Sequence, residues 1–228
     1  IGASNPAGDG GALTLQAGRS LLLNDDITTA NGNVSLIGNA TAADGVLDAD
    51  RDPGPATISM ATGTTLNTGT GSVTIEMRDG AGNTNTDTGD ITLGNITANQ
   101  LNLTHNGGSG SIAQNTGDAL TVTAATTIDA GPGKDITLDE NGNDFQGPVS
   151  ITSGKDVTLQ DANALDLGAS TISGALDVTA GGNITESGAL TVAGNASFAT
   201  ADGSDILLAS QPNDIAGGAS FAASTGNI

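Results

Sequence analysis

The chain has 228 residues and carries only five Lys or Arg against 25 Asp or Glu, so its formal net charge is −20. This charge repels phosphate backbones and anionic lipid headgroups, so we do not expect nucleic-acid binding. No stretch approaches the roughly 18 apolar residues that span a bilayer, so we do not expect direct membrane insertion either. The absence of Cys and the single His exclude disulfide scaffolds, thiol nucleophiles and His-rich metal sites.

The apolar residues of the sequence favour a thin core. Hydrophobic residues make up 36% of the chain but aromatic residues only 1%, and 35 residues are Gly. A compact globule normally fills its centre with some aromatic rings, whereas a narrow solenoid needs only small side chains stacked in rows. Disorder is the competing interpretation of so charged a chain, but Ile, Leu and Val recur here in regular short segments.

Twelve three-residue segments, taken in chain order, place an apolar residue on either side of a polar one. Their residue numbers are 13–15, 34–36, 73–75, 91–93, 101–103, 120–122, 136–138, 149–151, 157–159, 165–167, 176–178 and 190–192. This period of two is typical of a β-strand with one face buried and the other in water, and no segment has comparable support for a helix. Such short strands occur in sandwiches, barrels and solenoids alike.

Similarity at a distance favours the solenoid. Residues 119–122 resemble residues 189–192, residues 135–138 resemble residues 205–208, and residues 143–150 resemble residues 213–220. All three pairs share one offset of 70 in the sequence numbering. A stack of coils repeats in this way, whereas a sandwich has no reason to do so.

A shorter period runs inside this offset. Strand starts at Ile136, Val157, Leu176, Ala196 and Ala219 follow one another at intervals of 21, 19, 20 and 23 in the numbering. This spacing predicts an all-β fold, a parallel β-helix with about 20 residues and three short strands per coil. Since coils lie about 4.8 Å apart, roughly ten or eleven of them would form a rod about 50 Å long. We expect residues 1–228 to form one β-helix segment of a longer chain.

Two stretches depart from the pattern and are predicted to be projecting loops, near residues 39–56 and 78–89. The first contains Asp48, Asp50 and Asp52, alternate carboxylates that could converge on Ca²⁺, a cation that prefers oxygen ligands. The loop lacks the Gly and the bidentate Glu of an EF-hand, so a solvated acidic loop is the alternative interpretation. Calcium is the one possible cofactor that the sequence suggests.

The remaining candidate residues favour structural roles. His105 follows a predicted strand and is expected in a turn or at the surface, and the three rings, Phe145, Phe198 and Phe221, are expected in the core. Lys134-Asp135 and Lys155-Asp156 repeat at one corner, which indicates a structural ion pair more than a catalytic group. The sequence therefore predicts no catalytic residue and no enzyme.

Residues 11–29 and 32–36, and a later stretch from 155–159 through 176–185, resemble the central repeats of filamentous-haemagglutinin-like large exoproteins, which bacteria export by two-partner secretion. The resemblance covers most of the chain apart from the two predicted loops. It implies a right-handed β-helix, an extracellular or bacterial cell-surface location, and a role in adhesion or in a biofilm matrix.

The first functional hypothesis is a non-catalytic structural shaft of a secreted bacterial surface exoprotein, serving adhesion, matrix or extracellular filament formation. Its expected partners are further coils of the same chain or neighbouring subunits, end to end, and a cell-surface or glycan receptor. One alternative is a β-helical polysaccharide-acting enzyme, which would need clustered acids and a base on one face. The other is a calcium-dependent surface-layer module.

Overall fold

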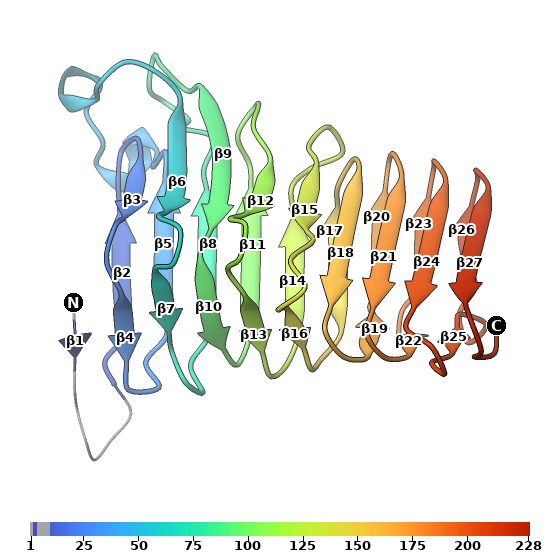
Figure 1. Cartoon of the computed structure of the whole chain (residues 1–228). Coiled ribbons are helices and arrows are strands. Elements are labelled where there is room, and N and C mark those ends of the chain that lie inside the picture. The colour runs from blue at the N-terminus through green and yellow to red at the C-terminus, as the bar shows by residue number, and fades with distance from the viewer. Residues whose placement is uncertain (1, 4–9) are drawn as a thin grey trace. The chain divides into compact units, whose positions relative to one another are not determined.

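The computed structural model describes residues 2–3 and 10–228, which contain 27 β-strands and two short 3₁₀ helices. Two compact units divide the chain, residues 1–118 and 119–228. Figure 1 shows that the strands of each unit stack side by side in columns. No helix in the described part of the chain is long and apolar enough to cross a membrane.

In the first unit, each strand pairs in parallel with the third strand after it. Three columns result. They are β1 (Gly2–Ala3), β4 (Ile27–Thr29), β7 (Thr65–Asn67) and β10 (Asn95–Ala98); β2 (Leu13–Gln16), β5 (Val34–Gly38), β8 (Val73–Met77) and β11 (Leu101–His105); and β3 (Leu21–Leu23), β6 (Ala56–Met60), β9 (Thr88–Leu93) and β12 (Ile112–Gln114).

The second unit follows the same parallel pairing with one local exception. Strand β17 pairs with β14, three strands before it, but also with β19, only two strands after it. The strands of this unit fall into four sets. They are β13 (Leu120–Val122) and β16 (Asp144–Phe145); β14 (Thr126–Asp129), β17 (Val149–Ser153), β19 (Leu165–Leu167), β22 (Ile184–Glu186) and β25 (Ile206–Leu207); β15 (Ile136–Leu138), β18 (Val157–Asp161), β21 (Leu176–Ala180), β24 (Ala196–Thr200) and β27 (Ala219–Ala223); and β20 (Ser170–Ile172), β23 (Leu190–Val192) and β26 (Asp214–Ile215).

The predicted coil length is confirmed by strand register. The five predicted starts are direct register partners, because Ile136 pairs with Val157, Val157 with Leu176, Leu176 with Ala196, and Ala196 with Ala219. The fold is a parallel β-helix with the predicted coil length. At three strands per coil, the described residues give four coils in the first unit and five in the second. The total of nine coils is below the predicted ten or eleven, because residues 39–55 and 78–87 are inserts that lengthen two of the coils.

The core follows from the period of two. All twelve predicted segments lie in strands, and their apolar residues are buried except for Leu13 and Leu15 on β2, which are partly exposed. Leu36 on β5 pairs with Ile75 on β8, and both side chains are fully buried.

The twelve segments and the starts at Ala196 and Ala219 account for 14 of the 27 described strands. Among the strands that the sequence did not identify, β14 and β20 have polar residues, Thr126 and Ser170, at inward positions.

The sequence offset of 70 has a structural counterpart in the second unit. Strand β14 pairs with β17 through Thr126 and Val149, and β24 pairs with β27 through Ala196 and Ala219, which are the same two positions moved by that offset. The two pairs nevertheless lie in different sheets. The unit that repeats at the offset of 70 contains ten strands, from β14 to the strand before β24. Ten strands make three coils and one additional strand. Equivalent residues of successive units therefore lie on different sides of the coil.

Asn and Asp side chains at the corners bind the backbone of a neighbouring coil. The N–H of Leu120 donates to Oδ1 of Asn143 (2.9 Å), and the N–H of Leu190 donates to Oδ1 of Asn213 (2.8 Å). The same kind of bond recurs at Asp26, Asp90, Asp156, Asn195 and Asp205. These bonds give several Asn and Asp side chains a structural role, because the N–H groups that they accept lie outside the strand ladder and need an acceptor.

Replacing Asn143 tests this role. Its side chain is fully buried, so Asn143→Ala leaves the N–H of Leu120 without its acceptor and should destabilise the chain by about 1–3 kcal/mol. The measurement is the urea midpoint of the circular-dichroism transition. Asn141→Ala, at an exposed residue of the same turn, serves as the control. Equal midpoints for the two variants would contradict the structural role of Asn143.

Candidate functional site

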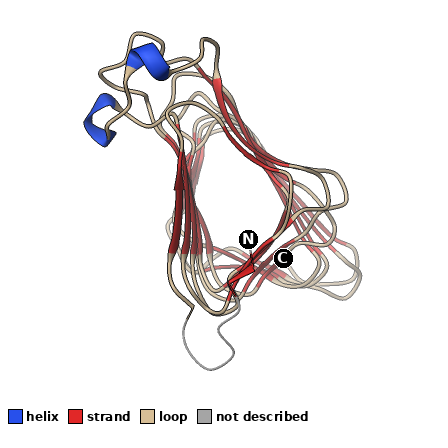
Figure 2. Cartoon of the chain, turned by 90° about the vertical axis from the view of Figure 1, so that its left-hand side faces the viewer, coloured by secondary structure: helices blue, strands red, loops and turns tan. Residues whose placement is uncertain are grey.

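Two inserts interrupt the coils of the first unit. Residues 39–55 separate β5 from β6 and contain the 3₁₀ helices η1 (Ala42–Asp44) and η2 (Asp48–Asp50), while residues 78–87 separate β8 from β9. Figure 2 shows both helices standing off one corner of the coil. We call these two inserts together the platform.

The local sequence explains how the first insert folds. The N–H and the hydroxyl of Thr41 both donate to Oδ2 of Asp44 at 2.8 Å, which closes the first turn of η1. Gly45 ends this turn in the left-handed region (φ 90°), where a residue with a side chain would be strained. Arg78 forms ion pairs with Asp44 and Glu76. The bond from Arg78, followed by those from Thr41, holds the pKa of Asp44 well below its usual range.

The two inserts contact each other directly. The N–H of Ala42 donates to the carbonyl of Ala81 (3.0 Å), and the N–H of Thr84 donates to both carboxylate oxygens of Asp48 (2.9 Å each). Asn83 Nδ2 donates to the carbonyl of Ala40 at 3.2 Å. The platform is therefore one packed structure and not two separate projecting loops.

Asn39 connects the platform to the coil. It is fully buried and left-handed (φ 53°), and its Nδ2 donates to the carbonyls of Arg78 (2.9 Å) and Thr86 (3.3 Å) in the second insert. Its Oδ1 accepts a hydrogen bond from Nη2 of Arg51 in the first insert. One amide thus holds both inserts at once.

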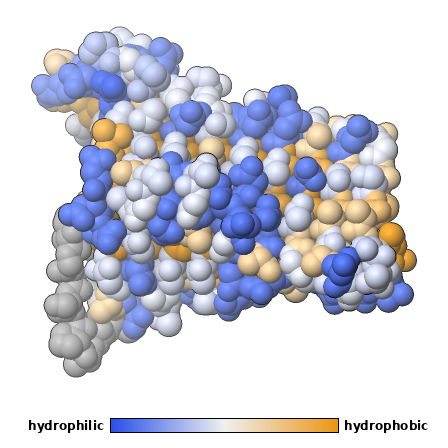
Figure 3. All heavy atoms as spheres, in the orientation of Figure 1, coloured by the Kyte–Doolittle hydropathy of each residue, from blue (hydrophilic) through white to orange (hydrophobic). Residues whose placement is uncertain are grey.

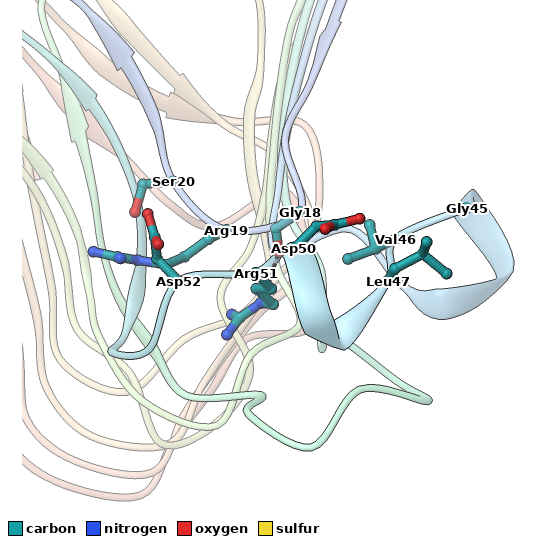
Figure 4. Close-up of a pocket in the computed structure, with 9 residues that line it drawn as sticks. All are labelled: Gly18, Arg19, Ser20, Gly45, Val46, Leu47, Asp50, Arg51 and Asp52. Carbon is teal, nitrogen blue, oxygen red and sulfur yellow. Dashed lines mark hydrogen bonds between the residues drawn. The ribbon is translucent and has the colours of Figure 1, made fainter.

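A pocket of about 500 Å³ lies between the first insert and the turn before β3. Figure 4 shows the residues that line it: Gly18, Arg19, Ser20, Gly45, Val46, Leu47, Asp50, Arg51 and Asp52. Nε of Arg51 donates to the carbonyl of Gly18 at 2.8 Å, which fixes the guanidinium against the coil. Burial, and then the charge of Arg19, lower the pKa of Arg51 below its usual value.

The three predicted calcium ligands do not form a cluster. Asp48 accepts the N–H of Thr84 with both oxygens, and Figure 4 shows the carboxylates of Asp50 and Asp52 pointing away from each other. Over residues 10–228, no three His, Asp or Glu side chains are placed to hold a metal ion. The geometry gives the calcium prediction no support.

His105 was expected in a turn or at the surface, and this expectation is wrong. It is the last residue of β11, its exposed fraction is 1%, and its Nε2 lies 2.9 Å from the carbonyl oxygen of Gly89. The period of two explains the difference, since Leu101, Leu103 and His105 occupy successive inward positions. The buried His is thus part of the core of the first unit.

The predictions for the rings and the Lys-Asp corners are confirmed in part. Phe145 and Phe198 are buried, but Phe221 is 40% exposed and stacks on Phe198 with a centroid distance of 5.5 Å. Lys155 forms ion pairs with Asp135 (3.3 Å) and Asp156 (2.8 Å), as predicted. Lys134 instead donates to the carbonyl of Ala130.

Sequence reasoning missed three buried acids, each of which accepts several hydrogen bonds. Asp118 accepts from the N–H of Gly63 and from Asn95, Glu186 accepts from the N–H groups of Ser210 and Gln211, and Asp161 accepts from the N–H groups of Phe145 and Asn163. Asp161 and Glu186 follow the inward phase of β18 and β22, so the period of two could have identified them. Asp118 lies outside the strands and carries no such signal.

Comparison with known proteins gives one family. The model described as "Repeats of unknown function (DUF5649)" matches residues 79–152 and 154–222, which is more than half of the chain. The chain belongs to this repeat family. The two matches end at residues 152 and 222, which differ by the same offset that relates the strand pairs of the second unit. No curated protein and no solved structure matches the chain.

The role of Asn39 is testable without straining the backbone. Asn39→Gly keeps the left-handed conformation but removes the amide that joins the inserts. Each lost hydrogen bond contributes about 0.5–1.5 kcal/mol, so limited proteolysis within residues 42–54 and 79–87 should accelerate about tenfold or more. Asn31→Gly, at a second left-handed Asn outside the platform, is the control. Unchanged cleavage at either insert would show that Asn39 does not hold the platform.

The buried Asp161 predicts a pH dependence. Burial raises the pKa of Asp161 above the ordinary 3.8, although hydrogen bonds from Asn163 and Phe145 oppose the shift. The folded state therefore holds this proton more tightly than the unfolded state, and the free energy of unfolding falls as the pH rises from 3.8 through the raised pKa. In urea titrations over this range, Asp161→Asn should lack that fall, while the exposed Asp177→Asn should retain it. Parallel pH curves for wild type and Asp161→Asn would contradict the prediction.

Proposed function

We propose that this chain is a non-catalytic structural segment of a secreted bacterial exoprotein of the filamentous-haemagglutinin-like kind. In this role the stacked coils supply length and stiffness at a bacterial cell surface or in an extracellular matrix. The parallel β-helix and the repeat family support the structural part of the proposal. The extracellular location, the adhesive role and a cell-surface or glycan receptor depend on the resemblance of residues 11–36 and 155–185 to such exoproteins.

The use of the acidic residues supports a structural role over a catalytic one. Asp26, Asp90 and Asp156 each accept a backbone N–H from a neighbouring coil. A glycan-cleaving site needs two carboxyl groups facing a substrate across a fixed gap. Carboxylates that bind the N–H groups of corners stabilise the coil instead.

The observation that carries the proposal is the parallel stacking of coils through register partners, which continues as far as β27. Within the described residues β27 pairs with β24 on one side of its sheet. Phe221 on β27 and Leu207 on β25 are 40% and 47% exposed, and Figure 3 shows apolar residues at the right-hand edge, where Figure 1 labels these strands. An unpaired strand with an apolar row beneath it is a template for another coil.

The partner that fits this edge is a further coil of the same kind. It comes either from the same polypeptide or from a neighbouring subunit placed end to end. Such a head-to-tail contact does not close on itself and therefore builds filaments. The net charge of −20 opposes contacts between chains, so association requires an interface, such as this apolar edge, that outweighs the repulsion.

The 228-residue chain should therefore associate through β27. Sedimentation velocity is expected to show association that grows with concentration, and Phe221→Glu should weaken it about tenfold or more, because covering a Phe side chain contributes about 1.5–3 kcal/mol. Leu47→Glu makes the same charge change at a residue that is 64% exposed on the platform, so it is the matched control. A monomer at all concentrations, or equal weakening by both variants, would contradict the proposed end-to-end contact.

A further inference from the structure

The pocket beside the platform holds two of the five basic residues of this acidic chain, Arg19 and Arg51. The charges of Arg78 and Lys155 are compensated by ion pairs with Asp or Glu. Within residues 10–228, neither Arg19 nor Arg51 forms an ion pair, although Asp50 and Asp52 line the same pocket. Burial of Arg51, and then the charge of Arg19, disfavour the charged form of Arg51, while the charges of Asp48 and Asp87 oppose this effect.

The hydrogen bonds of the two guanidinium groups are also incomplete. The partners of Arg51 are the carbonyl of Gly18 and the amide of Asn39, both uncharged. Nη1 of Arg51 and Nε of Arg19 are enclosed and have no hydrogen-bond partner. Arg19 and Arg51 as whole residues are only partly buried, so an anion in the pocket can approach the remaining N–H groups of the same guanidiniums and offset the cost of the two enclosed, unsatisfied N–H groups.

We propose that this pocket binds the carboxylate of an acidic sugar, such as one uronic acid unit of a polysaccharide. The planar guanidinium presents parallel N–H groups that match the two oxygens of a carboxylate. The site adds a specific ligand to a segment whose proposed function is structural, and it does not depend on that function.

The other pocket residues fit the rest of a sugar ring. Ser20, Asp50 and Asp52 offer a hydroxyl and carboxylate oxygens to ring hydroxyls, while Val46 and Leu47 offer an apolar surface to the C–H face. Leu47 is 64% exposed, so its side chain is accessible to a ligand in the pocket. The volume of about 500 Å³ lies within the range of small-ligand pockets and exceeds what a simple inorganic anion needs.

The test is a titration of the whole chain with sodium glucuronate at low salt, followed by the methyl NMR signals of Val46 and Leu47. We expect saturable shifts of these signals, and binding about tenfold weaker or more in Arg19→Gln, because a charge-assisted hydrogen bond is lost. Lys155→Gln is the control, since it removes one positive charge at an exposed residue that belongs neither to the platform nor to the pocket. The methyl spectrum of each variant without ligand, compared with that of the wild type, establishes that the variant folds.

Three further ligands decide the chemical class. Glucose, which has no carboxylate, should not bind, and sodium sulfate should bind more weakly than glucuronate. Glutamate, which has carboxylates and an ammonium group but no ring hydroxyls, should also bind more weakly. Equal binding of glucuronate to wild type and Arg19→Gln, binding of glucose, or tighter binding of glutamate or sulfate would each overturn the proposal, as would the absence of shifts with glucuronate.

Discussion

The structure depends on the parallel pairing of each strand with the equivalent strand one coil away. This pairing joins the backbone N–H and C=O groups of strands in successive coils, and it also places like residues on like residues. Inward positions therefore accept only side chains that stack in a row of limited width, which explains an aliphatic core with few rings. Outward positions are free to be Thr, Ser, Asn or Asp. Composition, strand length and coil length all follow from this one constraint.

Corners obey a different constraint, and they are where the chain varies. An N–H at a corner has no ladder partner, so an Asn or Asp side chain from the adjacent coil accepts it. Because a corner lies outside the ladder, it also tolerates insertion without disturbing strand register. The first insert greatly lengthens its coil, yet Val34 and Val73 on either side of it remain register partners. The platform and its arginine pocket thus use a position where the solenoid can gain a binding site with little effect on its core.

The sequence was sufficient for the fold because the period of two and the spacing between strand starts are both local signals. Both are repeated many times along the chain. The sequence was insufficient where an inward position holds a polar residue. His105, Asp161 and Glu186 are buried at inward positions of their strands, although residues of these types usually lie at the protein surface. The pocket could not be predicted, because Arg19 and Arg51 are brought together only by the folded insert and by Asn39. The separation of Asp50 from Asp52 likewise follows from the turn of η2 and not from their spacing in the sequence.

The most direct measurement of the stacking is disulfide trapping in this Cys-free chain, using outward residues of β18 and β21. Parallel register makes Thr158 the partner of Asp177 and Gln160 the partner of Thr179. Mild oxidation should therefore cross-link the double variants Thr158→Cys with Asp177→Cys and Gln160→Cys with Thr179→Cys, since a disulfide requires Cα atoms within about 7 Å. Cross-linking instead between positions 158 and 179, and between positions 160 and 177, would show antiparallel strands and contradict the stacked-coil account.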